Sequence, residues 1–142
     1  MSSPSHPQPE PDLNRRVLYV EHDPELCAVL PVLLTARGYQ VETARDGNEA
    51  WIRICAATQS VAKPFDLMIT DVDIPKLNGI ELIRRVRDAG FGVRIVVYAA
   101  KLAPEQQTEL DALMVNAVIQ KGTEAKTLLN LIHKVLAGER SG

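Results

Sequence analysis

The sequence has 142 residues, the length of a single domain. Hydrophobic residues make up 46% of it and aromatic residues only 4%, so an aliphatic core is expected. A formal net charge of −2, without a run of Lys or Arg, argues against nucleic acid as a partner, and no apolar stretch is long enough to span a membrane. The first residues lack the apolar segment of a secretory signal, so a cytoplasmic location is expected.

The chain divides into three parts. Four of the nine prolines fall in the first eleven residues, so residues 1–14 are expected to form a flexible tail. Residues 15–138 carry the apolar patterns of one folded domain, and residues 139–142 form a short C-terminal tail. Because only four residues follow Gly138, we expect either a stand-alone domain or one excised from a longer protein.

Short aliphatic runs alternate with helical patterns along the domain. The runs predicted as strands are Val17–Val20, Gln40–Ala44, Leu67–Thr70, Arg94–Tyr98 and Ala117–Gln120. Several are continuous Val, Ile and Leu runs, which is typical of parallel strands covered on both faces.

The predicted helices have recognisable ends. The first begins at Asp23 and Pro24, carries the apolar stripe Leu26, Val29, Leu30 and Leu33, and ends at Gly38; the second begins at Asp46; the third ends near Gly90; the fourth runs from Pro104 to about Met114; and Thr123 caps the fifth. Strands and helices in strict alternation predict an α/β fold, a doubly wound five-stranded parallel sheet with strand order 2-1-3-4-5. Its functional site is expected beyond the carboxyl ends of the strands.

Chemically distinctive side chains follow these strand ends. Glu21 and His22 follow the first strand, Asp71 the third and Lys121 the fifth. Two carboxylates at the switch point of the sheet, with a lysine from the edge strand beside them, suit phosphoryl chemistry. Asp71 is the possible nucleophile, and Lys121 can pair with Asp71 or with a phosphoryl oxygen. The alternative is a pair of carboxylates neutralised by one lysine for stability alone.

From Arg15 to about Ala137 the chain resembles the receiver domain of bacterial two-component response regulators. The segments that carry the likeness are VLYVEHDPEL, DGNEA, FDLMITDVDIPKLNGIELIRRVR and the QK at 120–121. Asp71, with a proline four and a glycine eight residues later, matches the family's phosphoacceptor loop. The resemblance implies a flavodoxin-like receiver fold, and an aspartate that takes a phosphoryl group from a histidine kinase or phosphotransfer protein.

The resemblance also implies a metal site and a switch, both altered here. Receivers hold Mg²⁺ with an acidic pair, the acceptor aspartate and a backbone carbonyl, which map to Glu21 with His22, Asp71, and the carbonyl of Asp73. Lys121 matches the family's lysine. Imidazole is a poor Mg²⁺ ligand, so we expect Mg²⁺ to bind weakly or not at all. A protonated His22 would replace part of the metal's charge; alternatively, His22 points into solvent.

Three further positions depart from the family pattern. Where the family has a hydroxyl residue that binds a phosphoryl oxygen, this chain has Ala99. Val118 stands at the position of the family's aromatic switch residue, and Gly122 at that of the proline after the lysine. Without the hydroxyl and the aromatic ring, phosphorylation is expected to be coupled only weakly to the face formed by the fourth helix, fifth strand and fifth helix. Candidate partner contacts on this face, each equally an ordinary solvated position, are Thr108, Glu109, Asp111, Ala112, Lys126, Asn130 and His133.

Three functions remain open from the sequence. The first is an atypical phosphorelay receiver that accepts a phosphoryl group on Asp71 and acts through protein contacts. The second is a pseudo-receiver that serves as a constitutive interaction module. The third is an enzyme, because DVD at 71–73 resembles the nucleophile motif of haloacid-dehalogenase-like phosphatases; that motif lies on the first strand of a larger domain and is not followed by Ile-Pro, so an enzyme is not expected.

Overall fold

A computed structural model describes residues 15–59 and 63–138 of the chain. The predicted tails, 1–14 and 139–142, lie outside the described residues. The predicted sheet is confirmed: five parallel strands lie in the order β2-β1-β3-β4-β5. The strands are β1 (Arg16–Val20), β2 (Gln40–Ala44), β3 (Leu67–Thr70), β4 (Arg94–Ala99) and β5 (Ala117–Gln120).

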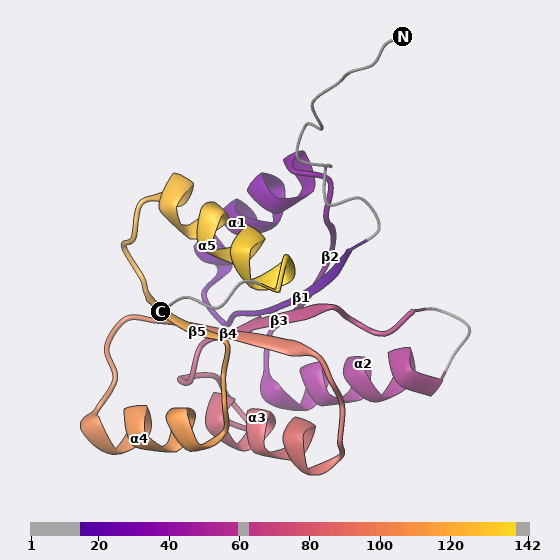
Figure 1. Ribbon diagram of the computed structural model, residues 1–142, viewed down its shortest axis with the longest axis vertical. Helices are drawn as coiled ribbons and strands as arrows, with labels where there is room; N and C mark the ends of the chain where they lie inside the picture. The colour runs from indigo at the N-terminus through magenta and orange to yellow at the C-terminus, as the bar shows by residue number, and fades with distance from the viewer. Residues whose placement is uncertain (1–14, 60–62, 139–142) are drawn as a thin grey trace, which may run out of the picture.

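Helices cover both faces of the sheet. They are α1 (Pro24–Ala36), α2 (Gly47–Gln59), α3 (Gly79–Asp88), α4 (Pro104–Ala112) and α5 (Ala125–Leu136). Figure 1 shows α1 and α5 on one face and α2, α3 and α4 on the other. This doubly wound arrangement explains why the central strands read as continuous apolar runs, since neither face meets water.

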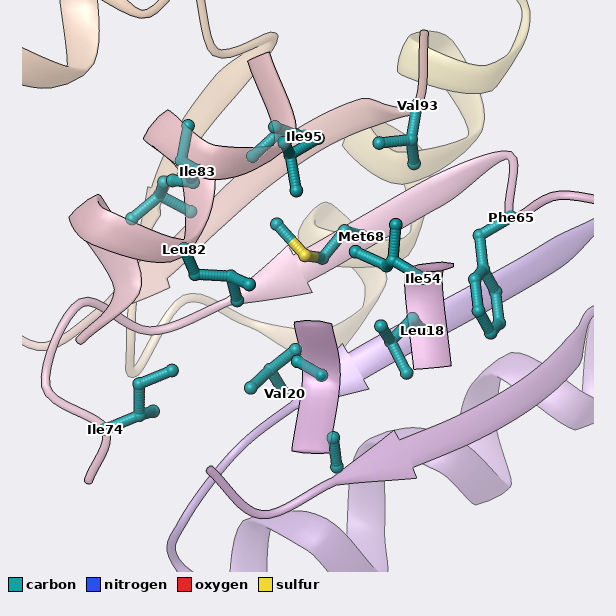
Figure 2. Packing of buried hydrophobic residues seen from close by; sticks show 14 of the residues in the cluster. Leu18, Val20, Ile54, Phe65, Met68, Ile74, Leu82, Ile83, Val93 and Ile95 are labelled. Carbon is teal, nitrogen blue, oxygen red and sulfur yellow. The ribbon is translucent and has the colours of Figure 1, made fainter. Parts of the chain in front are cut away.

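The sheet separates two hydrophobic cores. Leu18 and Val20 of β1 pack with Met68 of β3 in the core beneath α2, α3 and α4, shown in Figure 2. Val17 and Tyr19 point the other way, into the core beneath α1 and α5. The alternation along β1 therefore supplies both cores from one short strand.

Most predicted helix ends are confirmed, and two are wrong. The Asp23 side chain caps α1 by accepting from the Glu25 N–H at 2.9 Å. At α4, the helix ends at Ala112 rather than near Met114, because Met114 adopts φ 57° and so leaves the helical conformation. At α5, the N-cap is Glu124 rather than Thr123, whose hydroxyl instead donates to the Gln120 carbonyl at 2.6 Å.

The glycine eight residues after Asp71 lies where two pieces of backbone nearly touch. The Gly79 N–H donates to the Val72 carbonyl at 2.9 Å. A Cβ atom built on Gly79 would lie 2.1 Å from the Asp71 carbonyl oxygen and 2.7 Å from the Val72 Cα. Those contacts are with backbone, so a larger residue could be accommodated only by moving the loop that carries Asp71.

We therefore expect Gly79→Ala to destabilise the protein by at least about 1–3 kcal/mol, the usual cost of overpacking. Urea unfolding measures the change. Gly92→Ala is the matched control, because a Cβ there meets nothing within 4 Å. Equal stability of the two variants would mean that the close approach is not a constraint.

Candidate functional site

Strand register brings the acidic residues of the sequence together. Val20 of β1 lies opposite Thr70 of β3, so Glu21 and Asp71 both emerge at the same edge of the sheet. Lys121 directly follows β5, and its N–H donates to the Ala99 carbonyl at 2.8 Å. Its long side chain spans the end of β4 to reach the carboxylates.

Lys121 joins both carboxylates in one ion-pair cluster. Its ammonium nitrogen lies 2.6 Å from Asp71 Oδ2 and 3.0 Å from Glu21 Oε1. Glu21 is only 2% exposed and Asp71 only 7%, so water solvates neither carboxylate well and each needs a partner within the protein. Partial burial by itself would lower the pKa of Lys121, but the hydrogen bonds to Asp71 and Glu21 outweigh it, and the pKa is raised.

Glu21 has two further donors besides Lys121. The Tyr19 hydroxyl donates to Glu21 Oε1 at 3.3 Å, and the Asp23 N–H donates to Oε2 at 3.1 Å. Sequence reasoning missed Tyr19, which was treated only as part of an apolar run. The available signal was a phenol two positions before Glu21, since alternate residues of a strand share a face.

Hydrogen bonds in the loop after β3 hold the backbone of Asp71 in place. The Thr70 hydroxyl donates to the Asp71 carbonyl at 2.8 Å, and the Asp73 N–H donates to Asp71 Oδ1 at 3.3 Å. The Asp73 side chain is exposed. Asp71 Oδ2 is thus bound to a cation, whereas Oδ1 has one long hydrogen bond from the backbone, which leaves lone pairs available for chemistry.

His22 is exposed, although it follows the buried Glu21 directly. This position agrees with the interpretation in which its side chain faces solvent. Lys121 supplies one positive charge against the two carboxylates. A charge-balancing role for a protonated His22 stays a prediction.

The donors do not fit a Mg²⁺ site well. Mg²⁺ requires a near-octahedral shell of oxygen ligands, usually with carboxylates free to bind it. Here Glu21 and Asp71 are both ion-paired with Lys121. Within residues 15–59 and 63–138, no group of three or more His, Cys, Asp or Glu side chains is arranged to hold a metal ion.

We predict that His22→Asp, which restores an acidic pair, raises Mg²⁺ affinity about tenfold or more, because a tenfold change needs only about 1.4 kcal/mol. Isothermal calorimetry measures it. His22→Asn is the control, since it alters the shape without adding a charge. Equal Mg²⁺ affinity of the Asp and Asn variants would show that this position does not contribute to cation binding.

The remaining altered positions line the ends of β4 and β5. Ala99 is 3% exposed and lies opposite Gln120 in the sheet. Val118 is 37% exposed on β5. Gly122 adopts φ 96°, which a proline ring, fixed near about −65°, could not reach. The loop after Lys121 is thus built for glycine.

The fold and the arrangement of Asp71, Lys121 and Glu21 agree with the result of comparison to known families. The model of the response regulator receiver domain matches residues 17–133. The chain belongs to the response regulator receiver domain family. Receiver domains are signalling modules of two-component systems. They receive phosphoryl groups from histidine kinases or phosphotransfer proteins, and they typically bind Mg²⁺ for this transfer.

Individual relatives support the assignment of the receiver domain. A gliding motility regulatory protein of Myxococcus xanthus is 36% identical over 100 residues, which cover 68% of this chain but only 12% of that protein. The response regulator receiver protein CpdR of Brucella abortus is 29% identical over 86% of this chain and 97% of its own length. The structure of chemotaxis protein CheY4 of Vibrio cholerae has a TM-score of 0.73 at 28% identity and covers 85% of this chain and 98% of that one.

The partner face predicted for this receiver domain is largely solvent-exposed. Thr108, Glu109, Asp111, Ala112, Lys126 and Asn130 are all exposed. Glu109 also pairs with Arg84 of α3 at 2.9 Å, and His133 is only half-buried and has contacts of its own. Exposure fits either a docking surface or an ordinary solvated face, so the partner face stays a prediction.

No helix in the described part of the chain is long and apolar enough to cross a membrane.

Proposed function

We propose that this receiver accepts a phosphoryl group on Asp71 from a histidine kinase or phosphotransfer protein in the cytoplasm. The observation that carries the proposal is the Asp71 carboxylate at the carboxyl end of β3 with the Lys121 ammonium 2.6 Å from it. A buried nucleophile beside a fixed cation is suited to a transfer in which negative charge collects on phosphoryl oxygens.

The proposed transfer involves the side chains of Asp71, Lys121 and Glu21. An oxygen of Asp71 bonds to phosphorus while the bond from phosphorus to the donor nitrogen of phosphohistidine breaks, and the leaving imidazole takes a proton from water. Lys121 then exchanges its bond to Asp71 Oδ2 for one to a phosphoryl oxygen. Its second bond, to Glu21 at 3.0 Å, keeps the ammonium in the site during this exchange.

Phosphorylation of Asp71 is proposed to change the face of α4, β5 and α5 only weakly. Ala99 supplies no hydroxyl to a phosphoryl oxygen, and Val118 supplies no aromatic ring that could move with it. Output is therefore proposed to occur through protein contacts that include the face of α4, β5 and α5, without catalysis by this domain. Asp73 is exposed, which speaks against its acting as a phosphatase acid beside Asp71.

A second function, that of a pseudo-receiver, is favoured by a specific observation. Lys121 forms ion pairs with both Glu21 and Asp71 and cancels one of their two negative charges, so both carboxylates have a partner without a metal or a phosphoryl group. In that case the pair of carboxylates and the lysine would serve stability, and the domain would bind a partner constitutively.

Intact-mass spectrometry separates the two functions. The protein is treated with acetyl phosphate in Mg²⁺ and then in Mn²⁺. The proposal expects one phosphoryl adduct, lost in Asp71→Asn and kept in the matched control Asp73→Asn. A folded protein without an adduct under either condition would contradict the proposal and leave the pseudo-receiver as the function.

A further inference from the structure

Tyr19 places a phenol in β1 between Leu18 and Val20, which point to the opposite core. Its side chain is completely buried, with 0% exposure. A buried phenol normally finds a hydrogen-bond partner, and here the hydroxyl donates to Glu21 Oε1 at 3.3 Å. Residues 19 and 21 share a face of the chain, so the tyrosine reaches the site from within the core beneath α1 and α5.

The Glu21 carboxylate contacts Tyr19 through one oxygen and Lys121 through both, since the Lys121 ammonium also donates to Oε2 at 3.2 Å. Oε1 accepts from the Tyr19 hydroxyl and lies 3.0 Å from the Lys121 ammonium. Oε2 accepts from the Asp23 N–H at 3.1 Å. Donors thus approach Glu21 from the core, from the backbone and from the site, and the carboxylate has little freedom to rotate.

We propose that Tyr19 is a positioning residue for phosphoryl transfer: its hydroxyl orients Glu21, and Glu21 in turn holds Lys121 within reach of Asp71. This inference rests on the proposed function. Tyr19 never touches the phosphoryl group. It acts through Glu21, which is the second anchor of Lys121 when the ammonium leaves Asp71 for a phosphoryl oxygen.

The hydroxyl is suited to this role over the whole physiological pH range. Burial, followed by the negative charge of Glu21, raises the pKa of Tyr19 far above its ordinary value of 10.0. The phenol therefore stays protonated and keeps donating. Without it, Glu21 Oε1 would be satisfied by Lys121 alone, and the ammonium would be drawn away from Asp71.

Tyr19→Phe removes only the hydroxyl. We expect the rate of adduct formation with acetyl phosphate to fall about five- to tenfold, the effect of a modest hydrogen bond. Tyr98→Phe is the matched control, since Tyr98 is also buried, at 7% exposure, in the same core. It should phosphorylate within about twofold of the wild type. Equal rates for the two variants would overturn the inference.

A second readout does not depend on phosphorylation. We expect the carboxyl carbon signals of Glu21 and Asp71 in ¹³C NMR to shift in Tyr19→Phe and to stay in place in Tyr98→Phe. Unmoved signals in Tyr19→Phe would overturn the positioning role even if the rate fell. If the wild type takes no phosphoryl group, the proposed function fails, while these signals still decide whether Tyr19 orients the cluster.

The reciprocal experiment covers the case in which Tyr19→Phe does not fold. Glu21→Gln keeps the phenol and removes the charge that it faces. The Tyr19 Cζ signal is then expected to shift, with that of Tyr98 unchanged. An unchanged Tyr19 Cζ signal in Glu21→Gln would contradict a hydrogen bond from Tyr19 to Glu21.

Discussion

Replacing Lys121 with methionine is expected to destabilise the protein by about 3 kcal/mol at neutral pH, the lower end of the cost of breaking a buried ion pair. The side chains of Glu21 and Asp71 are only 3% and 9% exposed, and both would lose their cation. The lower end applies because the Lys121 side chain is itself 18% exposed. Urea unfolding measures the loss, and Lys101→Met, at an exposed position, is the control.

The pH dependence of this loss has a definite sign. The pKa of Lys121 is raised in the folded state, so its contribution to stability is complete below its ordinary value of 10.5 and disappears as the pH rises through the folded value. The stability gap between wild type and Lys121→Met should therefore be constant at neutral pH and narrow only above pH 10.5. A gap that narrows between pH 7 and 9 would contradict the ion pair as its source.

The second large effect is expected from Ala99→Ser, which returns a hydroxyl to the end of β4. A hydrogen bond to a charged group contributes about 1.5–3 kcal/mol, so the equilibrium for Asp71 phosphorylation should shift about 10- to 150-fold toward the adduct. The fraction phosphorylated at a fixed acetyl phosphate concentration measures it.

Ala100→Ser is the matched control for this prediction, because Ala100 is the next residue and is exposed, whereas Ala99 is buried. Only the inward-facing hydroxyl should stabilise the adduct. A similar gain in both variants, or in neither, would contradict the assignment of Ala99 to the phosphoryl pocket.

The central strands were predictable because short, continuous Val, Ile and Leu runs that alternate with helical patterns are typical of a parallel sheet covered on both faces. The first helix shows the limit of such patterns. Val29 was placed in its apolar stripe but is 54% exposed, while Leu34, outside the proposed stripe, is fully buried. An apolar residue does not reveal which side of a helix meets the sheet when nearly every position is apolar.

The site was predictable where it depends on strand ends. Asp71, Glu21 and Lys121 were placed together because parallel strands deliver their carboxyl ends to one edge, and the structure brings them together. The link from Tyr19 was missed, because it depends on how far a buried side chain reaches along its own strand. The exposure of His22 could not be decided either, since the strand pattern extends to Glu21, whose N–H donates to the Ala44 carbonyl, and not beyond it.

Locating the phosphoryl group after incubation with a phosphohistidine donor tests directly whether Asp71 is the phosphoacceptor. Borohydride reduction of the acyl phosphate, followed by peptide mass spectrometry, identifies which aspartate carried the phosphoryl group. We expect a label on Asp71 that is absent when Asp71→Asn is treated in the same way. A label on another aspartate, or none on a folded protein, would contradict it.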